Sequence, residues 1–195
     1  LREADMLLST MPNQDPKLGY LINYFLGNIH HNSRNYTSAD HHFLRALRFS
    51  HEEKDSIHLF DSYLALFWNE MQQRNIQNGK SYLDSLSLFY NKLPQKDYFI
   101  LNTQSFYYDV VEEPLIALDR EKAKLSLYSV QDENVEVSRV YYNISNRFVG
   151  LQELDSAMLY AQMALEIIED SSYVYNHMYY ENVANIAEKQ NNFAY

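Results

Sequence analysis

Residues 26–46 read LGNIHHNSRNYTSADHHFLRA, and this stretch predicts two helices joined by a tight turn. After the turn, Ala39, Phe43 and Ala46 follow one another at intervals of four and three residues, which places them on one helical face. Gly27 lies inside the first helix, where a glycine costs about 1 kcal/mol relative to alanine. We therefore expect a neighbouring helix to approach closely at Gly27.

The same arrangement recurs along the chain. Ala39, Gly79, Ala117 and Ala157 occupy the equivalent small-residue position and lie 40, 38 and 40 residues apart. A near-constant period of this size indicates stacked supersecondary units. The third copy is the least regular, because Ala117 is its only good match to the small-residue pattern.

The composition is that of a globular chain rich in helices. Of the 195 residues, 46% are hydrophobic and 22% are charged, which excludes a disordered or collagen-like chain. Four Gly and four Pro are too few to supply the turns of a many-stranded sandwich or barrel. The sequence has no run of about 18 apolar residues and no apolar leader, so we expect no membrane insertion by this segment.

The charge and the absence of cysteine exclude several classes of partner and chemistry. Sixteen Lys and Arg residues oppose 26 Asp and Glu residues, and the resulting net charge of -10 repels phosphate backbones. We therefore expect no direct contact with nucleic acid. The absence of cysteine excludes disulfides and thiol chemistry, and it fits a cytoplasmic or a periplasmic segment equally well.

The repeated motif resembles that of the tetratricopeptide repeat family. The family signature of Leu-Gly followed by Ala, an aromatic residue and Ala is matched in the first repeat by Leu26, Gly27, Ala39, Phe43 and Ala46. The fourth repeat matches it with conservative changes at Ile144, Ser145, Phe148, Ala157, Ala161 and Ala164. The departures are His30, which replaces the usual tyrosine, and a period near 40 instead of about 34 residues.

The resemblance implies an all-α fold, an α-solenoid of stacked antiparallel helical hairpins wound into a right-handed superhelix. We expect a single domain over residues 1–195, with repeats at 17–50, 57–91, 97–130 and 136–169 and a truncated fifth at 173–195. The segment Leu1–Met11 reads as a lone helix that either caps the stack or completes an earlier hairpin. Because Leu1 is not a natural initiator and the chain stops inside the fifth repeat, we expect a fragment of a longer protein.

In this family the first helix of each hairpin lines a concave groove that holds a partner. The resemblance therefore assigns the following partner-binding residues: Tyr24, Asn28, His31, Leu64, Trp68, Met71, Arg139, Tyr142 and Asn146. Trp68 and the tyrosines also fit core positions, since packing is the commoner role of a large aromatic ring. Asn28 resembles one member of the family's carboxylate clamp, but Tyr24 stands where the basic member would be, which disfavours a clamp for peptide C-termini.

Patterns for catalysis and metal binding are weak. Six histidines lie in or near the first hairpin: His30, His31, His41, His42, His51 and His58. The sequence specifies no third ligand beside either adjacent pair and fixes no geometry for the other two. Three acidic pairs read as solvated charge near helix ends: Glu112-Glu113, Asp132-Glu133 and Glu169-Asp170. With no phosphate loop, nucleophile elbow or HExxH motif, we predict no enzymatic activity, no metal and no cofactor.

Three functional hypotheses follow. The leading one is a protein-interaction module that holds a partner protein or peptide in the groove of a tetratricopeptide-like superhelix. The second is a sensory or regulatory input domain of a bacterial membrane-associated or transcriptional regulator. Degenerate repeats of long period resemble repeat regions of such multidomain proteins, and any membrane tether would lie outside this segment. The third is self-association through the ends of the stack, because an uncapped solenoid exposes an apolar face.

Overall fold

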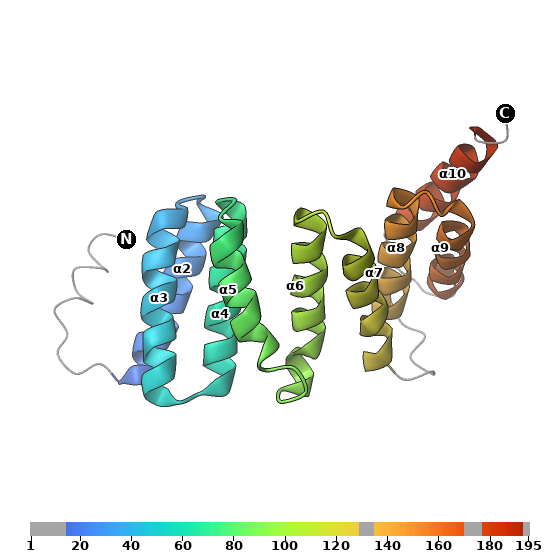
Figure 1. Cartoon of the computed structure of the whole chain (residues 1–195). Coiled ribbons are helices and arrows are strands. Elements are labelled where there is room, and N and C mark those ends of the chain that lie inside the picture. Colours follow the sequence, from blue (N-terminus) through green and yellow to red (C-terminus); the bar gives the residue numbers. More distant parts are fainter. Residues whose placement is uncertain (1–14, 129–134, 170–176, 193–195) are drawn as a thin grey trace. The chain divides into compact units, whose positions relative to one another are not determined.

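The fold is all-α, as predicted (Figure 1). This computed structural model describes residues 15–128, 135–169 and 177–192, and within these ranges it contains helices and no strand. The chain divides into two compact units, residues 1–94 and residues 95–195, which we call unit 1 and unit 2. The single domain, its repeat boundaries and the direction of the superhelix stay predictions, and the predicted helix Leu1–Met11 lies outside the described residues. No described helix combines the length and the apolar character needed to cross a bilayer.

Unit 1 consists of consecutive helices, each packed against the next. They are α2 (Pro16–Asn32), α3 (Tyr36–Glu53), α4 (Ser56–Gln72) and α5 (Ile76–Ser87). Each of the first three begins at a side chain that accepts a hydrogen bond from the first helical turn, namely Asp15, Asn35 and Asp55. Such N-caps satisfy backbone N–H groups that have no partner within the helix. Helix α2 also contacts α4, so α3 covers one side of that pair.

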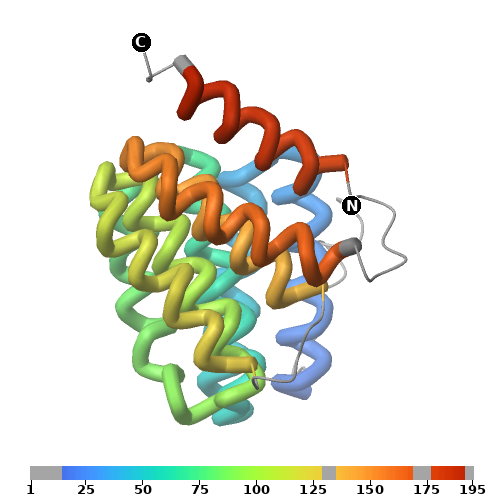
Figure 2. Tube along the Cα trace, turned by 90° about the vertical axis from the view of Figure 1, so that its right-hand side faces the viewer, coloured from blue at the N-terminus to red at the C-terminus, as the bar shows by residue number. Residues whose placement is uncertain are grey.

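Unit 2 continues the alternation of helices and turns. It contains α6 (Asp97–Val110), α7 (Pro114–Ala123), the 3-10 turn η2 (Lys124–Leu127), α8 (Val135–Gly150), α9 (Leu154–Glu169) and α10 (His177–Asn192), and the 3-10 turn η1 (Pro94–Lys96) precedes α6. Figure 2 shows α10 alongside α9, and α8 contacts both of these helices. The main apolar core of this unit lies between α8 and α9 and includes Val140, Ile144 and Ala161.

The same turn closes each helical hairpin. Arg34, Arg74, Glu112 and Gln152 all adopt the left-handed conformation, with φ between 58° and 63°. The N–H of the following residue then bonds to the carbonyl five residues back, for example from Glu153 to the Phe148 oxygen at 3.0 Å. This bond satisfies a carbonyl that the ending helix leaves without a partner.

Small residues bring the paired helices close together. Ala39, Ala117 and Ala157 are completely buried. In unit 2, the hydroxyls of Ser105 and Ser145 donate across the hairpin to the carbonyls of Ala117 and Ala157, at 2.9 and 2.8 Å. A larger side chain at either alanine would hold the helices too far apart for this bond.

The predicted close approach at Gly27 is confirmed. A Cβ atom on Gly27 would overlap the ring of Phe43, which fills the space that the glycine leaves. Gly150 is different, because it is exposed at the end of α8 and a Cβ there would have no neighbour within 4 Å. Helix α8 extends through Gly150, and the left-handed residue of the following turn is Gln152.

Alanine substitutions at these two glycines should change stability in opposite directions. Gly27→Ala forces Phe43 to move, and we expect it to lower the free energy of unfolding by about 1–3 kcal/mol. Gly150→Ala gains helix propensity without a clash and should leave stability equal or raise it by up to about 1 kcal/mol. Urea unfolding followed by circular dichroism measures both, and a Gly27→Ala protein as stable as the parent would show that Phe43 yields at no cost.

Candidate functional site

A cavity of about 230 Å³ opens among α2, α3 and α4 of unit 1, and we call it the groove cavity. Its lining residues are Tyr24, Asn28 and His31 from α2, Phe43 from α3, and Leu64, Ala65 and Trp68 from α4. Five of these seven were among the residues predicted for partner binding. The structure therefore gathers them at one place, and their contact with a partner stays a prediction.

The base of the groove cavity is aromatic and rigid. Phe43 is 1% exposed and lies 6.1 Å from Tyr24, centroid to centroid. Trp68 packs edge-to-face against the buried Phe67, with ring centroids 5.1 Å apart. Burial, and then the carboxylate of Asp61, raise the pKa of Tyr24, which keeps its hydroxyl protonated at neutral pH.

A buried amide holds His31 in place. Asn69 is 0% exposed, and its amide group donates to the Tyr36 carbonyl at 2.9 Å and to Oδ1 of Asp40 at 2.6 Å. These two acceptors fix the orientation of the amide, so its oxygen is the atom that faces Nδ1 of His31, at 2.8 Å. Gln73 donates to the other oxygen of Asp40 at 2.9 Å and completes the network.

This geometry determines which ring nitrogen of His31 carries the hydrogen. An amide oxygen only accepts, so Nδ1 of His31 must be the donor. In the neutral ring, Nε2 is then an acceptor, and it has no hydrogen-bond partner among the described residues. Asn28 keeps similar capacity, because its amide donates to the Tyr24 carbonyl at 3.0 Å while its oxygen receives no hydrogen bond from the described part of the chain.

The other predicted groove residues lie elsewhere. Met71 is 8% exposed and packs against α5, where its Sδ would be 2.6 Å from a Cβ on Gly79, and it does not line the groove cavity. Its contact with a partner stays a prediction. Arg139, Tyr142 and Asn146 lie on α8 of unit 2. Arg139 pairs with Glu136 at 3.2 Å, and Tyr142 packs against Tyr179 of α10. A role for these three in binding stays a prediction.

Unit 2 buries an ion pair that the sequence did not reveal. Glu121 is 2% exposed and Lys124 is 0% exposed, with 2.9 Å between Nζ and Oε1. Lys124 also donates to Asn102 at 2.8 Å, and Glu121 accepts from Ser105 and Asn143, both at 3.0 Å. Burial lowers the pKa of Lys124, and the attraction of Glu121 opposes that effect. Because its polar atoms are paired within the unit, we assign this cluster to packing.

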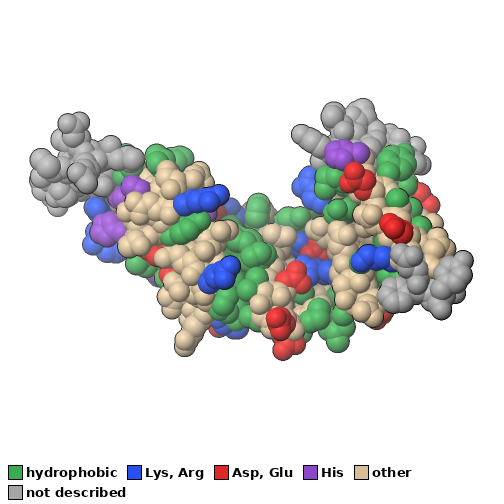
Figure 3. Space-filling model, turned by 90° about the horizontal axis from the view of Figure 1, so that it is seen from above, with side chains coloured by type: hydrophobic (Ala, Val, Ile, Leu, Met, Phe, Trp, Pro, Cys, Tyr) green, Lys and Arg blue, Asp and Glu red, His purple; other side chains and the backbone are tan. Residues whose placement is uncertain are grey.

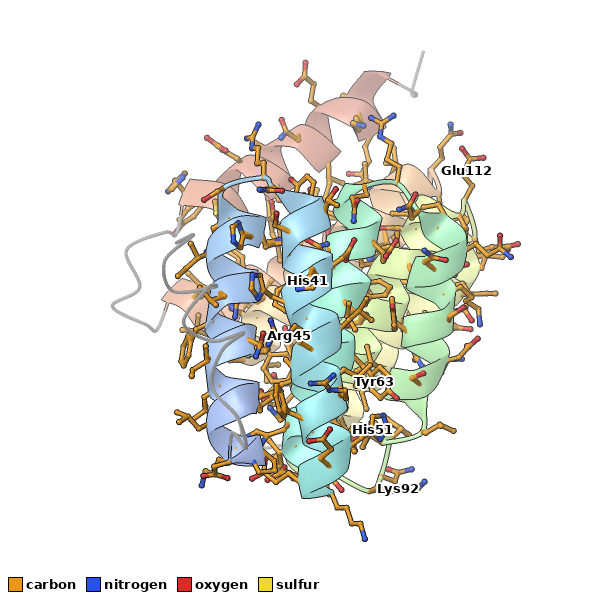
Figure 4. The ribbon with its side chains drawn as sticks, turned by 90° about the vertical axis from the view of Figure 1, so that its left-hand side faces the viewer. His41, Arg45, His51, Tyr63, Lys92 and Glu112 are labelled. Carbon is orange, nitrogen blue, oxygen red and sulfur yellow. The ribbon has the colours of Figure 1, made fainter. Side chains whose placement is uncertain are left out.

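A second cavity of about 380 Å³, which we call the end cavity, lies at one end of unit 1. Its wall is mainly apolar, with Leu59, Leu88, Phe89 and Leu93, and the polar residues that complete it are His51, Ser56, Tyr63, Ser85 and Lys92. Figure 4 shows His51, Tyr63 and Lys92 at this end, from α3, α4 and the segment after α5. No sequence motif pointed to this cavity, because its residues come from α3, α4, α5 and the segment after α5.

The adjacent histidines of the first hairpin do not belong to a group of three metal-ligating side chains among the described residues. His30 stacks on His42 with ring centroids 5.3 Å apart, and His42 is 2% exposed, with Nδ1 at 3.3 Å from Oδ1 of Asn23. In the part of the chain that the structure describes, the group with three metal-ligating side chains within reach is Glu53, Asp55 and His58. Acidic and basic side chains are interspersed on the face shown in Figure 3, so the distribution of charge there does not indicate a binding site.

No protein-family model and no curated protein matches this chain. Solved structures do match it. BtubC (BKLC) from P. vanneervenii has a TM-score of 0.79 at 16% identity, covering 99% of this chain and 81% of that chain. The apo form of RapI gives 0.84 at 15%, covering 98% of this chain and 54% of RapI, and MamA gives 0.59 at 14%, covering 89% and 83%.

These similar structures are tetratricopeptide-like helical repeat proteins. At such low identity the likeness shows the fold alone, and it confirms that this chain has a tetratricopeptide-like α-solenoid fold. Its length corresponds to about half of RapI. The likeness therefore assigns no role to the residues of the groove cavity.

Removing the amide of Asn69 should release His31. Asn69→Ala leaves the Tyr36 carbonyl, Asp40 and His31 without this partner, and we expect a loss of about 2–3 kcal/mol in the free energy of unfolding. Gln73→Ala is the matched control, since it removes two half-buried hydrogen bonds, one to Asp40 and a longer one to the Asn69 carbonyl, and should cost about 1 kcal/mol. Nitrogen-15 NMR of the neutral His31 ring should find the hydrogen on Nδ1 in the parent, and a hydrogen on Nε2 would contradict the assigned network.

Proposed function

We propose that this chain is a protein-interaction module in which the groove cavity accepts one apolar side chain of an extended partner segment. The observation that carries the proposal is the gathering of Tyr24, Asn28, His31, Leu64 and Trp68 from two helices around one opening. The similar helical repeat structures support an interaction role in general, without identifying a partner.

The size of the groove cavity favours a side chain over a small molecule. Pockets that enclose drug-sized ligands start at about 300 Å³, and the groove cavity measures about 230 Å³. Its aromatic and aliphatic lining suits an apolar anchor that is withdrawn from water. Burial of a Leu or Phe side chain stabilises a complex by about 1.5–3 kcal/mol before the entropy of ordering is subtracted.

Two polar groups beside the cavity suit a peptide backbone. Asn28 has a side-chain oxygen that receives no hydrogen bond from the described residues, and this oxygen can accept from the N–H of one peptide unit. His31 adds an acceptor at Nε2, held in position by Asn69. An extended segment with an apolar residue flanked by accessible backbone therefore fits this surface.

Trp68 makes the proposal directly measurable, because it is the only tryptophan in the chain. Peptides that bind the full chain can be selected from a displayed random library and then titrated while the fluorescence of Trp68 is recorded. We expect an emission shift that saturates with binding. Trp68→Ala should weaken the same peptides by about 2 kcal/mol, roughly 30-fold, as is usual for a central aromatic anchor.

Leu44→Ala is the matched control for this experiment. Leu44 is an apolar residue of α3 that is 48% exposed and lines neither cavity, so its loss should leave peptide affinity unchanged. If selected peptides bind equally well to Trp68→Ala and leave the tryptophan emission of the parent unchanged, the groove cavity is not the binding site.

The end cavity favours a second candidate function, the sensing of a small molecule. At about 380 Å³ it falls within the size range of ligand pockets, and its apolar wall ends at Lys92 and His51. Lys92 makes no ion pair with a described residue and lies beside an apolar wall in an acidic chain. This arrangement fits a ligand with an aliphatic body and a carboxylate.

Decanoate and decanol separate this candidate from nonspecific apolar binding. Decanoate should raise the melting temperature, because a ligand at about 100 times its Kd stabilises the folded state by about 2.7 kcal/mol. Lys92→Gln should abolish the preference for decanoate over decanol, while Lys80→Gln, which alters an exposed pair with Asp84, should not. Equal binding of both probes to the parent chain would rule out recognition of a carboxylate.

A further inference from the structure

The turn between α3 and α4 brings together three side chains that the groove cavity does not use. Glu53 is the last residue of α3, Asp55 is the N-cap of α4, and His58 lies in the first turn of α4. Lys54 adopts the left-handed conformation between them and reverses the chain. One ligand atom from each of Glu53, Asp55 and His58 lies within 4.8 Å of the other two.

The ring of His58 is oriented before any ligand arrives. It stacks on Tyr20 of α2, with centroids 3.8 Å apart and planes 20° from parallel. In this position Nδ1 lies 2.9 Å from Oε2 of Glu53 and 3.8 Å from Oδ2 of Asp55. One imidazole nitrogen therefore faces two carboxylates at once.

A single hydrogen on that nitrogen cannot serve both carboxylates. Glu53 is at hydrogen-bond distance, but the 3.8 Å to Asp55 exceeds it. The other oxygen of Asp55, Oδ1, is fixed by the N–H groups of Ile57 and His58, at 2.8 and 3.0 Å. Oδ2 is thus held close to the imidazole and receives no hydrogen bond from it.

The surroundings of the cluster are negative. Two carboxylates face one imidazole, and Lys17 is the lysine that acts on Asp55. Burial, together with the charges of Asp61, Asp55 and Glu53, raises the pKa of the neighbouring Tyr20. The three ligand side chains are 18% to 35% exposed, so an ion can reach them from solvent while part of its hydration is replaced.

We propose that Glu53, Asp55 and His58 form a site for a divalent transition-metal ion, for which Zn²⁺ is the best fit. Zinc binds imidazole nitrogen and carboxylate oxygen at about 2.0–2.2 Å, which puts neighbouring ligand atoms about 3.3–3.6 Å apart in a tetrahedron. The distances of 2.9 and 3.8 Å from Nδ1 bracket that range. Imidazole as a ligand disfavours Mg²⁺ and Ca²⁺, which prefer oxygen.

Such an ion would join three helices at one end of unit 1. Glu53 belongs to α3 and His58 to α4, and the stack on Tyr20 extends the link to α2. Because metal binds the folded arrangement and not the unfolded chain, it should stabilise this unit. The inference is independent of partner binding in the groove cavity, which uses other residues.

The test is a titration of the full chain, stripped of metal with a chelator, with Zn²⁺ by calorimetry and with Co²⁺ by visible absorption. We expect one Zn²⁺ bound per chain, the absorption of a nitrogen- and oxygen-ligated cobalt site, and a melting temperature raised by about 5 °C or more at saturation. Mg²⁺ and Ca²⁺ at the same concentration should produce no such shift.

The variants are chosen to keep the fold while removing a ligand. His58→Phe retains a ring that can stack on Tyr20, and Asp55→Asn retains an N-cap acceptor. Each should weaken Zn²⁺ binding more than about tenfold, since even loss of a supporting partner of a ligand has an effect of that size. Glu52→Gln is the control, because Glu52 is exposed next to the site and pairs with Arg48.

Three outcomes would overturn the proposal. The first is failure of the folded parent chain to bind Zn²⁺ at a ratio of one to one. The second is unchanged binding in His58→Phe and Asp55→Asn, which would place the ion at histidines elsewhere. The third is equal stabilisation by Ca²⁺ and Zn²⁺, which would show general attraction of cations to an acidic surface.

Discussion

The contact between Gly27 and Phe43 is the constraint on which the candidate site depends. Phe43 occupies the space that a side chain on Gly27 would fill, so α2 and α3 pack at short range. The same ring forms the base of the groove cavity, which therefore exists at its present depth because the residue opposite is glycine. Close packing of this kind leaves little freedom for adjustment, since protein interiors are as dense as organic crystals. Tyr24 and Trp68, which line the cavity beside Phe43, each contact a buried phenylalanine ring.

Buried polar groups have different roles in the two units. In unit 1, the fully buried Asn69 accepts a hydrogen bond from Nδ1 of His31 and so orients its ring. The second ring nitrogen of His31 can then accept a hydrogen bond. In unit 2, Glu121 and Lys124 bond to each other and to the neighbouring side chains of Asn102 and Asn143, which suits a packing role. A buried ion pair of this sort contributes little net stability but is costly to break, because either charge alone would remain without compensation.

Helix α4 contributes to all three candidate binding features of unit 1. Its N-terminus carries the ligand cluster with His58, its middle lines the end cavity with Leu59 and Tyr63, and its later turns line the groove cavity with Trp68. A helix with distinct neighbours along its length can present different chemistry in each turn. This arrangement links small ligands to the same scaffold that would hold a partner, since anything that stabilises α4 supports the groove cavity as well.

The sequence by itself determined the fold class, because the spacing of Ala39, Phe43 and Ala46 and its recurrence leave one way to bury the apolar faces, by pairing helices. The resemblance to the repeat family suggested Tyr24, Asn28 and Trp68 as groove residues, and the structure places all three around the groove cavity, while their contact with a partner stays a prediction. Only the tertiary structure decided that Met71 belongs to the core, that Glu121 and Lys124 are buried together, and that Glu53, Asp55 and His58 converge. The position of Met71 depends on the neighbouring helix α5, and the convergence of the acidic residues with His58 depends on the turn at Lys54 and the ring of Tyr20. Contacts between elements are set by how helices pack and turn, and a linear pattern carries no direct record of that geometry.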